Sequence, residues 1–179
     1  MFAMSRVPYV ILSLALGIIS AFSQSTSFQD TLLDGLSGHW ILQGTIAGRE
    51  TIHDIDAEWV LGHQYLQFRE VSREKDSTGA AAYEATVFIG WDQNVQEYAC
   101  LWLDVTGGGG LTANAIGHAP RSSDQINFLF KGSDGNVFHT NFIYGRDADT
   151  WKWLMDSEDH GKLQPFARVA LRRASQRGQ

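Results

Sequence analysis

Hydrophobic and polar residues alternate along most of the chain downstream of Trp40. Within residues 51–60, His53, Ile55 and Trp59 share one face, whereas the acidic residues share the other. A period of two residues is typical of half-buried β-strands. Ten strands are expected in this way, at Trp40–Ile46, Thr51–Val60, Tyr65–Val71, Tyr83–Trp91, Glu97–Asp104, Leu111–Gly117, Gln125–Lys131, Val137–Tyr144, Thr150–Asp156 and Phe166–Arg173. Because no helical pattern separates them, they predict an all-β fold, an up-and-down antiparallel β-barrel of about ten strands, with a sandwich as the alternative.

Turn-forming residues separate these segments. Residues 133–136 contain an Asp-Gly pair, which supplies the positive φ that a tight hairpin needs. The four glycines at 107–110 lack the following Lys-Ser or Lys-Thr of a phosphate-binding loop. They predict a flexible hairpin tip that can act as a lid at a barrel mouth. Before the first strand, a short helix is expected, capped by Ser27 and ended by Gly35.

The first 25 residues have the three parts of a secretory signal. Arg6 supplies positive charge, residues 10–19 form an apolar core too short to span a bilayer, and Ala21-Phe22-Ser23 is a cleavage site. We therefore expect a signal peptide over 1–23, a spacer and short helix over 24–35, the barrel over 36–174 and a tail over 175–179. This organisation predicts a secreted or periplasmic protein with no membrane segment after cleavage, and an uncleaved N-terminal anchor is the alternative.

Charge and cysteine content narrow the classes of partner. The formal net charge is −6, and removal of residues 1–23 takes away one Arg and no acid, which leaves −7. Such a chain repels phosphate backbones, so nucleic acid is not an expected partner. Cys100 is the single cysteine and lies in an apolar strand, so we expect a buried small hydrophobe and no disulfide within the chain. An unpaired edge between the first and last strands would let two copies pair, so the oligomeric state stays open.

Four short motifs, in order, resemble those of a known group of proteins. They are Leu36-Ser37-Gly38-His39-Trp40 followed by Gly44, then Glu58 to Leu66, then Gly90-Trp91-Asp92 with Trp102-Leu103-Asp104, and finally Trp151 to Met155 with the basic strand 168–173. The chain resembles a bacterial family of unknown function with a calycin, or lipocalin-like, barrel fold. It is distantly similar to nitrobindin-like and fatty-acid-binding barrels. The resemblance implies the barrel and a ligand cavity, and it implies no catalytic residue.

An antiparallel barrel of this size has room for its own side chains and for one small ligand. The faces predicted to point inward are rich in aromatic residues, which suits a small hydrophobic molecule. The expected ligand-binding residues, with His53 as the polar contact, are Trp40, His53, Trp59, Trp102, Phe128 and Phe142. Two other functions stay open: a small barrel enzyme that uses His53 and Asp104 as acid and base, and a structural or interaction module with a filled core.

The six histidines do not form the close H-x-H or H-x-x-x-H pairs typical of metal sites, so no metal ion, cofactor or catalytic residue is assigned. Haem binding is less favoured, because it needs a proximal histidine below an open pocket. The acidic residues around Asp156 and His160 lack the spacing of a calcium loop and predict a solvated loop. Trp40 is expected to plug the closed end of the barrel under Arg172 or Arg168 through a cation–π contact.

Overall fold

A computed structural model describes residues 27–107, 110–133 and 135–175. The expected signal peptide, the two central glycines of the glycine run and Asp134 of the Asp-Gly turn lie outside these ranges. The strands are β1 (Gly38–Ile46), β2 (Arg49–Val60), β3 (Tyr65–Ser72), β4 (Glu84–Asp92), β5 (Glu97–Asp104), β6 (Ile116–Ala119), β7 (Gln125–Lys131), β8 (Val137–Gly145), β9 (Thr150–Asp159) and β10 (Lys162–Arg173). The helices are α1 (Thr31–Leu36) and the 3₁₀ turns η1 (Ala113–Ala115) and η2 (Arg146–Ala148). The described helices do not include one that is long and apolar enough to cross a membrane.

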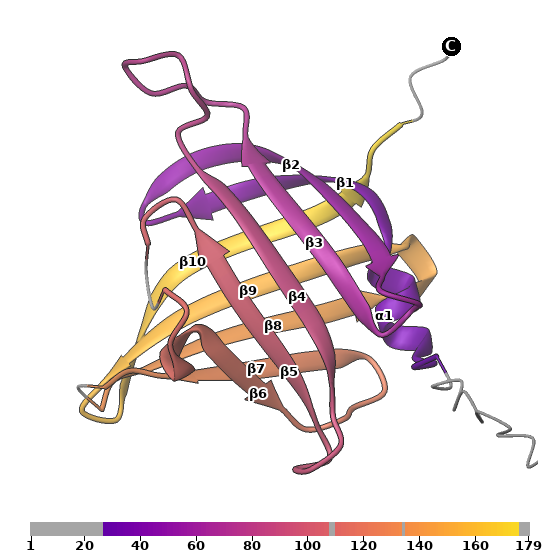
Figure 1. The fold of residues 1–179 in the computed structure, drawn as a ribbon. Helices are drawn as coiled ribbons and strands as arrows, with labels where there is room; N and C mark the ends of the chain where they lie inside the picture. The colour runs from indigo at the N-terminus through magenta and orange to yellow at the C-terminus, as the bar shows by residue number, and fades with distance from the viewer. Residues whose placement is uncertain (1–26, 108–109, 134, 176–179) are drawn as a thin grey trace, which may run out of the picture.

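The strands form a closed antiparallel barrel in which each strand pairs with its neighbours in sequence (Figure 1). The sheet closes where β1 pairs with β10, from Trp40 opposite Arg173 to Ile46 opposite Ala167. The predicted all-β, ten-stranded up-and-down barrel is therefore confirmed. Closure leaves no unpaired edge between the first and last strands, which the sequence had left open, because β1 and β10 pair with each other.

Two segments differ from the predicted strands. The segment after the glycine run begins with η1, so β6 starts at Ile116 instead of Leu111 and pairs with β7 only at His118 opposite Leu129. At the other end of the chain, β9 and β10 extend to a tight hairpin in which Asp159 pairs with Lys162. The exposed, polar residues of that hairpin carry little apolar periodicity, so only the backbone ladder defines them as strand.

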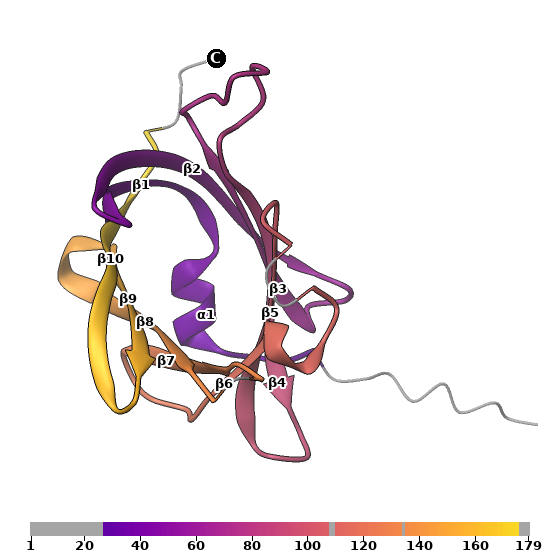
Figure 2. The ribbon, with the colours of Figure 1, turned by 90° about the vertical axis from the view of Figure 1, so that its left-hand side faces the viewer.

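The helix α1 closes one end of the barrel. Its N-cap is Asp30 and not the expected Ser27, because Asp30 Oδ1 accepts hydrogen bonds from the backbone N–H groups of Leu32 and Leu33, at 3.0 Å each. Its C-cap is Ser37, so the helix does not end at Gly35, and the Ser37 N–H donates back to the Leu33 carbonyl. Figure 2 shows α1 inside the ring of strands, where Leu32, Leu33 and Leu36 are buried.

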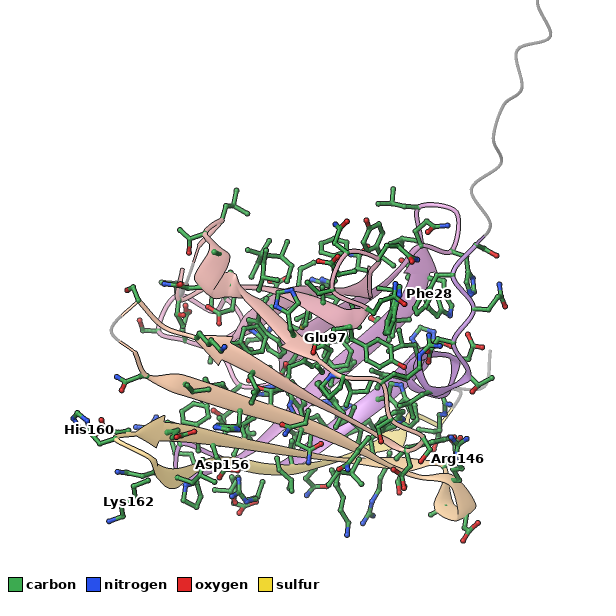
Figure 3. The ribbon with its side chains drawn as sticks, turned by 90° about the horizontal axis from the view of Figure 1, so that it is seen from below. Phe28, Glu97, Arg146, Asp156, His160 and Lys162 are labelled. Atoms are coloured by element: carbon green, nitrogen blue, oxygen red, sulfur yellow. The ribbon has the colours of Figure 1, made fainter. Side chains whose placement is uncertain are left out.

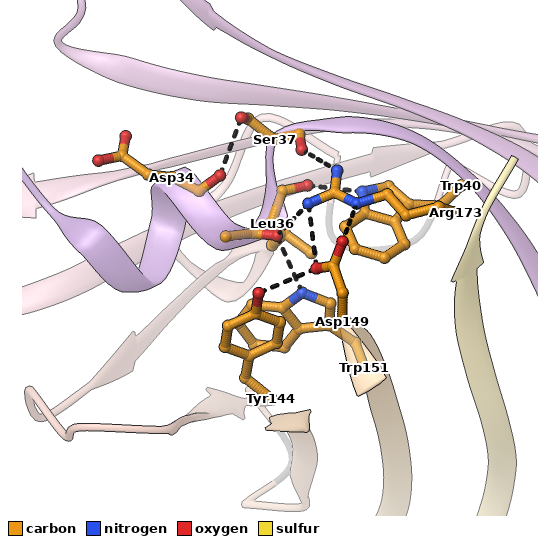
Figure 4. Close-up of polar contacts among 9 residues, drawn as sticks. Asp34, Leu36, Ser37, Trp40, Tyr144, Asp149, Trp151 and Arg173 are labelled. Carbon is orange, nitrogen blue, oxygen red and sulfur yellow. Dashed lines mark hydrogen bonds and ion pairs between the residues drawn. The ribbon is translucent and has the colours of Figure 1, made fainter. Parts of the chain in front are cut away.

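Trp40 lies at this closed end under a terminal arginine, but the arginine is Arg173 and not Arg172 or Arg168. The guanidinium of Arg173 lies 3.8 Å from the centre of the Trp40 ring (Figure 4). Arg173 is the residue of β10 that pairs with Trp40, and Asp149 holds its Nε at 2.8 Å. Arg168 lies lower on β10 and pairs with Asp156 instead. The register between β1 and β10 therefore decides which arginine covers the indole.

The glycines of the opening motif permit this close approach. Gly38 has φ of 121°, and a Cβ there would lie 2.3 Å from Nη1 of Arg173. Gly44 has φ of 150°, and a Cβ there would lie 2.3 Å from the Arg168 carbonyl oxygen. Only glycine adopts these dihedral angles without strain and leaves room for the neighbouring strand. The motif at Gly38-x-Trp40 is thus explained by packing at the closed end.

The interior is layered along the barrel axis, and β9 passes through every layer. Trp151 packs at the α1 end, where its Nε1 donates to the Gly35 carbonyl at 3.2 Å (Figure 4). Trp153 lies in the middle, stacked on Phe142 with ring centres 4.6 Å apart. Met155 lies beyond Trp153, on the wall of a cavity. The middle layer is a solid aromatic core, and the layer above it is hollow.

Candidate functional site

A cavity of about 700 Å³ occupies the barrel end opposite α1. In Figure 3, Phe28 and Arg146 mark the α1 end, and His160 and Lys162 mark the end that contains the cavity. Apolar side chains form much of its wall, among them Ile46, Ala115, Phe130, Phe138, Met155 and Phe166. Exposed residues of the connecting segments, such as Ala47, Ala82 and Thr106, line its mouth. The cavity is therefore a concave, largely apolar site with access to solvent.

A polar group on β2 and β3 lines one side of this cavity. His53 and Glu70 are 4% and 1% exposed, and His53 Nδ1 contacts Glu70 Oε1. Thr51 Oγ1 lies 2.8 Å from the other ring nitrogen, Nε2 of His53. The alternation of β2 places Thr51 and His53 on the inner face. Pairing in the barrel brings Glu70 of β3 alongside them.

A second polar group continues this wall. The ring of Tyr83 stacks on His53, with centres 5.7 Å apart, and its hydroxyl donates to Asp104 Oδ2 at 3.3 Å. The Trp102 indole N–H donates to the Tyr83 hydroxyl at 3.2 Å. Burial, followed by the negative charge of Glu70, raises the pKa of Tyr83 well above its ordinary value. The phenol therefore stays protonated and acts as the hydrogen-bond donor to Asp104.

Of the polar groups in this wall, the Glu70 carboxyl group is the one whose burial is least offset by hydrogen bonds. Burial raises the pKa of its carboxyl group above the ordinary 4.5, the contact with His53 opposes this shift, and the charge of Asp104 adds to it. Its Oε2 is buried without a hydrogen-bond partner among the described residues. A buried carboxyl group with one unpaired oxygen lowers the stability of the fold when the group is ionised.

The replacement Glu70→Gln should therefore become more favourable as the pH rises. A raised pKa means that ionisation of Glu70 destabilises the folded state, and this loss grows as the pH rises above 4.5 and through the raised pKa. Glutamine does not ionise. We expect the difference in melting temperature, variant minus wild type, to be larger at pH 8 than at pH 4.5, measured by circular dichroism. A difference that is constant with pH would contradict the assignment.

The expected ligand-binding residues fall at three heights in the barrel. Only His53 and Trp102 line the cavity. Phe128 and Phe142 belong to the buried aromatic core beneath it, and Trp40 lies at the closed end. Trp59 also lies at the closed end, where its indole N–H donates to Asp34 at 2.9 Å and its ring stacks on His63. Six residues separate Trp59 from His53, which is roughly 20 Å along a strand.

The structure gives His53 partners other than the one expected. Its carboxylate partner is Glu70, and Asp104 joins the group only through Tyr83. Both ring nitrogens of His53 contact protein groups, Glu70 on one side and Thr51 on the other. No nitrogen is left to take a proton from a substrate or to ligate haem iron without a rearrangement.

The other candidate polar residues lie outside this wall or are unreactive. Within residues 27–107, 110–133 and 135–175, no three His, Cys, Asp or Glu side chains come together as a metal site. Asn114 lines the cavity, but its amide bridges the Lys131 carbonyl at 3.1 Å and the Ser133 N–H at 3.3 Å, and it does not pair with Asp104. Cys100 is fully buried, and burial raises the pKa of its thiol, so the thiol stays neutral and unreactive.

Glu70 and Tyr83 are the important residues that the sequence pattern did not single out. The alternation of β3 places Leu66, Phe68 and Glu70 on the inner face, so an inward acid was readable there. Tyr83 lies just before β4, in a segment without periodicity, and only its contacts place it in the site. Gly107 and Gly110 flank the mouth, as expected for the hairpin tip.

No protein-family model and no curated protein matches this chain.

Proposed function

We propose that this protein binds a small, mostly apolar molecule in the cavity of the barrel. The observation that carries the proposal is the hollow of about 700 Å³ above a tightly packed aromatic core. This volume is typical of small-molecule sites, and a closed barrel provides rigid walls for such a site. A filled-core module would not need the hollow, because the apolar side chains around it would pack against one another.

The side chains at the mouth support entry of an apolar molecule. Val105, Leu111 and Phe166 are 61%, 86% and 40% exposed, and all three lie on segments at the cavity end of the barrel. Exposed apolar residues beside a cavity are typical of ligand entry sites. Binding is favoured over acid–base catalysis because both nitrogens of His53 are already engaged.

We also propose that the protein is an exported member of the calycin-like group. The closed up-and-down barrel, with a Gly-x-Trp opening and an arginine over the tryptophan, supports membership of the calycin-like group. The apolar run at residues 10–19, with Arg6 before it and small residues after it, supports export. When the full chain is expressed in a bacterial host, we expect an exported protein whose N-terminus follows Ser23 or Ser25.

A neutral fluorescent probe tests the binding proposal. N-phenyl-1-naphthylamine should show saturable fluorescence enhancement with the protein, and Phe138→Ala should weaken its binding about ten-fold, because Phe138 forms part of the apolar wall. Val137→Ala is the matched control, since Val137 precedes Phe138 on β8 and faces the other way. Absence of saturable binding, or equal affinities for the two variants, would contradict the proposal.

A further inference from the structure

The unpaired oxygen of Glu70 is not explained by an entirely apolar ligand. Glu70 is 1% exposed and lines the cavity, and its Oε2 has no hydrogen-bond partner in the part of the chain that the structure describes. Because nearly all buried polar atoms in folded proteins are paired, an unpaired one on a residue that lines a cavity indicates that the ligand supplies the partner. In its ionised form this carboxylate oxygen only accepts, so the ligand must donate a hydrogen bond there.

The charges around the cavity favour a positive donor. Four acids line it, Glu50, Glu70, Glu74 and Asp104, against one arginine, Arg49, and the buried His53. Asp104 accepts hydrogen bonds from the Tyr83 hydroxyl and from the backbone N–H of Thr106. The potential inside the cavity is therefore negative, and a negative potential attracts cations and repels carboxylates.

Aromatic rings lie beside these acids. Tyr83 stacks on His53, and Trp102 donates to the Tyr83 hydroxyl, so both rings lie in the same wall as the carboxylates. The faces of such rings attract ammonium groups, and a cation near two carboxylates also relieves their mutual repulsion. The opposite wall, with Phe130 and Phe138, is apolar.

Building on the binding function proposed above, we propose that the ligand is an organic amine. Its protonated amino group donates a hydrogen bond to Oε2 of Glu70, and its apolar body contacts Phe130 and Phe138. Ligands with an anionic head, such as fatty acids, are disfavoured by the same carboxylates.

A matched series of three compounds tests this assignment by isothermal titration calorimetry at pH 7. Decylamine, 1-decanol and decanoate share one apolar chain and differ in the charge of the head. We expect decylamine to bind at least about ten-fold more tightly than 1-decanol, since its ammonium group carries a charge opposite to that of the carboxylate and a hydroxyl group carries none, and decanoate to bind most weakly.

The variant Glu70→Gln locates the preference. The decylamine to 1-decanol affinity ratio should fall to within about two-fold, because a glutamine amide carries no charge that distinguishes an ammonium group from a hydroxyl group. Glu58→Gln is the matched control, since Glu58 lies on the outer face of β2, and it should keep the full preference. An unchanged preference in Glu70→Gln overturns the role of Glu70.

The wild-type ranking separates the two proposals even if the variant does not fold. Equal binding of all three compounds overturns the amine assignment and leaves the binding function standing. Binding of the neutral probe without binding of decylamine has the same meaning. Absence of binding of every compound, including the neutral probe, overturns both.

Discussion

Replacement of Trp153 by alanine is expected to lower the free energy of unfolding by about 3–5 kcal/mol. Trp153 is fully buried in the middle of the barrel, where it stacks on Phe142 and meets Phe68 edge to face with ring centres 5.8 Å apart. Its ring also packs against that of Trp102 in the cavity wall, with ring centres 5.4 Å apart. The alanine variant would leave the rings of Phe142, Phe68 and Trp102 without the indole that they all pack against. No neighbouring side chain can move into the space of an indole, so a cavity would remain.

Trp153→Phe is the matched control, and it should cost only about 1 kcal/mol. Phenylalanine keeps the stacking on Phe142, and the indole N–H that it removes has no hydrogen-bond partner among the described residues. Urea unfolding followed by circular dichroism measures both variants. Equal losses in the two would show that the aromatic packing does not carry the stability.

The second large effect is expected at Asp30, where alanine should lower the free energy of unfolding by about 3 kcal/mol. Asp30 is 7% exposed, and its Oδ1 caps α1 through the N–H groups of Leu32 and Leu33. Its Oδ2 accepts a hydrogen bond from the Tyr98 hydroxyl at 2.7 Å. The loss combines a helix cap of about 1 kcal/mol with a buried hydrogen bond to a charged group of about 2 kcal/mol. The pair with the half-exposed Arg121 adds little.

Asp30→Asn separates the cap from the charge. Asparagine caps helices as well as aspartate does, so this variant should keep the cap and lose only part of the contact with Tyr98. We expect a loss of about 1 kcal/mol in the same urea experiment. Hydrogen exchange of the α1 amide groups should rise in Asp30→Ala and stay near the wild-type rate in Asp30→Asn. Exchange that is equal in both would show that Asp30 does not anchor the helix.

These two sites and the cavity occupy separate layers of one barrel. Asp30 holds the helix at the closed end, Trp153 fills the middle, and Glu70 lies on the wall of the hollow end. Changes in the first two layers should alter stability, whereas a change at Phe138 should alter binding.

The sequence by itself determined most of the strands and, for several of them, the inner face. Alternation with a period of two is a property of each strand alone, so it placed His53, Ile55 and Ala57 inward before any tertiary contact was known. The same signal favoured an up-and-down barrel, with a sandwich as the alternative, because strands at regular spacing have few other ways to bury one face. It also predicted that Trp40 lies at the closed end beneath an arginine.

Only the tertiary structure decided the height of each inward residue and its partners. Alternation gives a side but no position along the barrel axis, so His53 and Trp59 looked equivalent although one lines the cavity and the other meets α1. Register between strands selected Arg173 over its neighbours and brought Glu70 beside His53. Register depends on the pairing of whole strands around a closed sheet, and no local pattern encodes it.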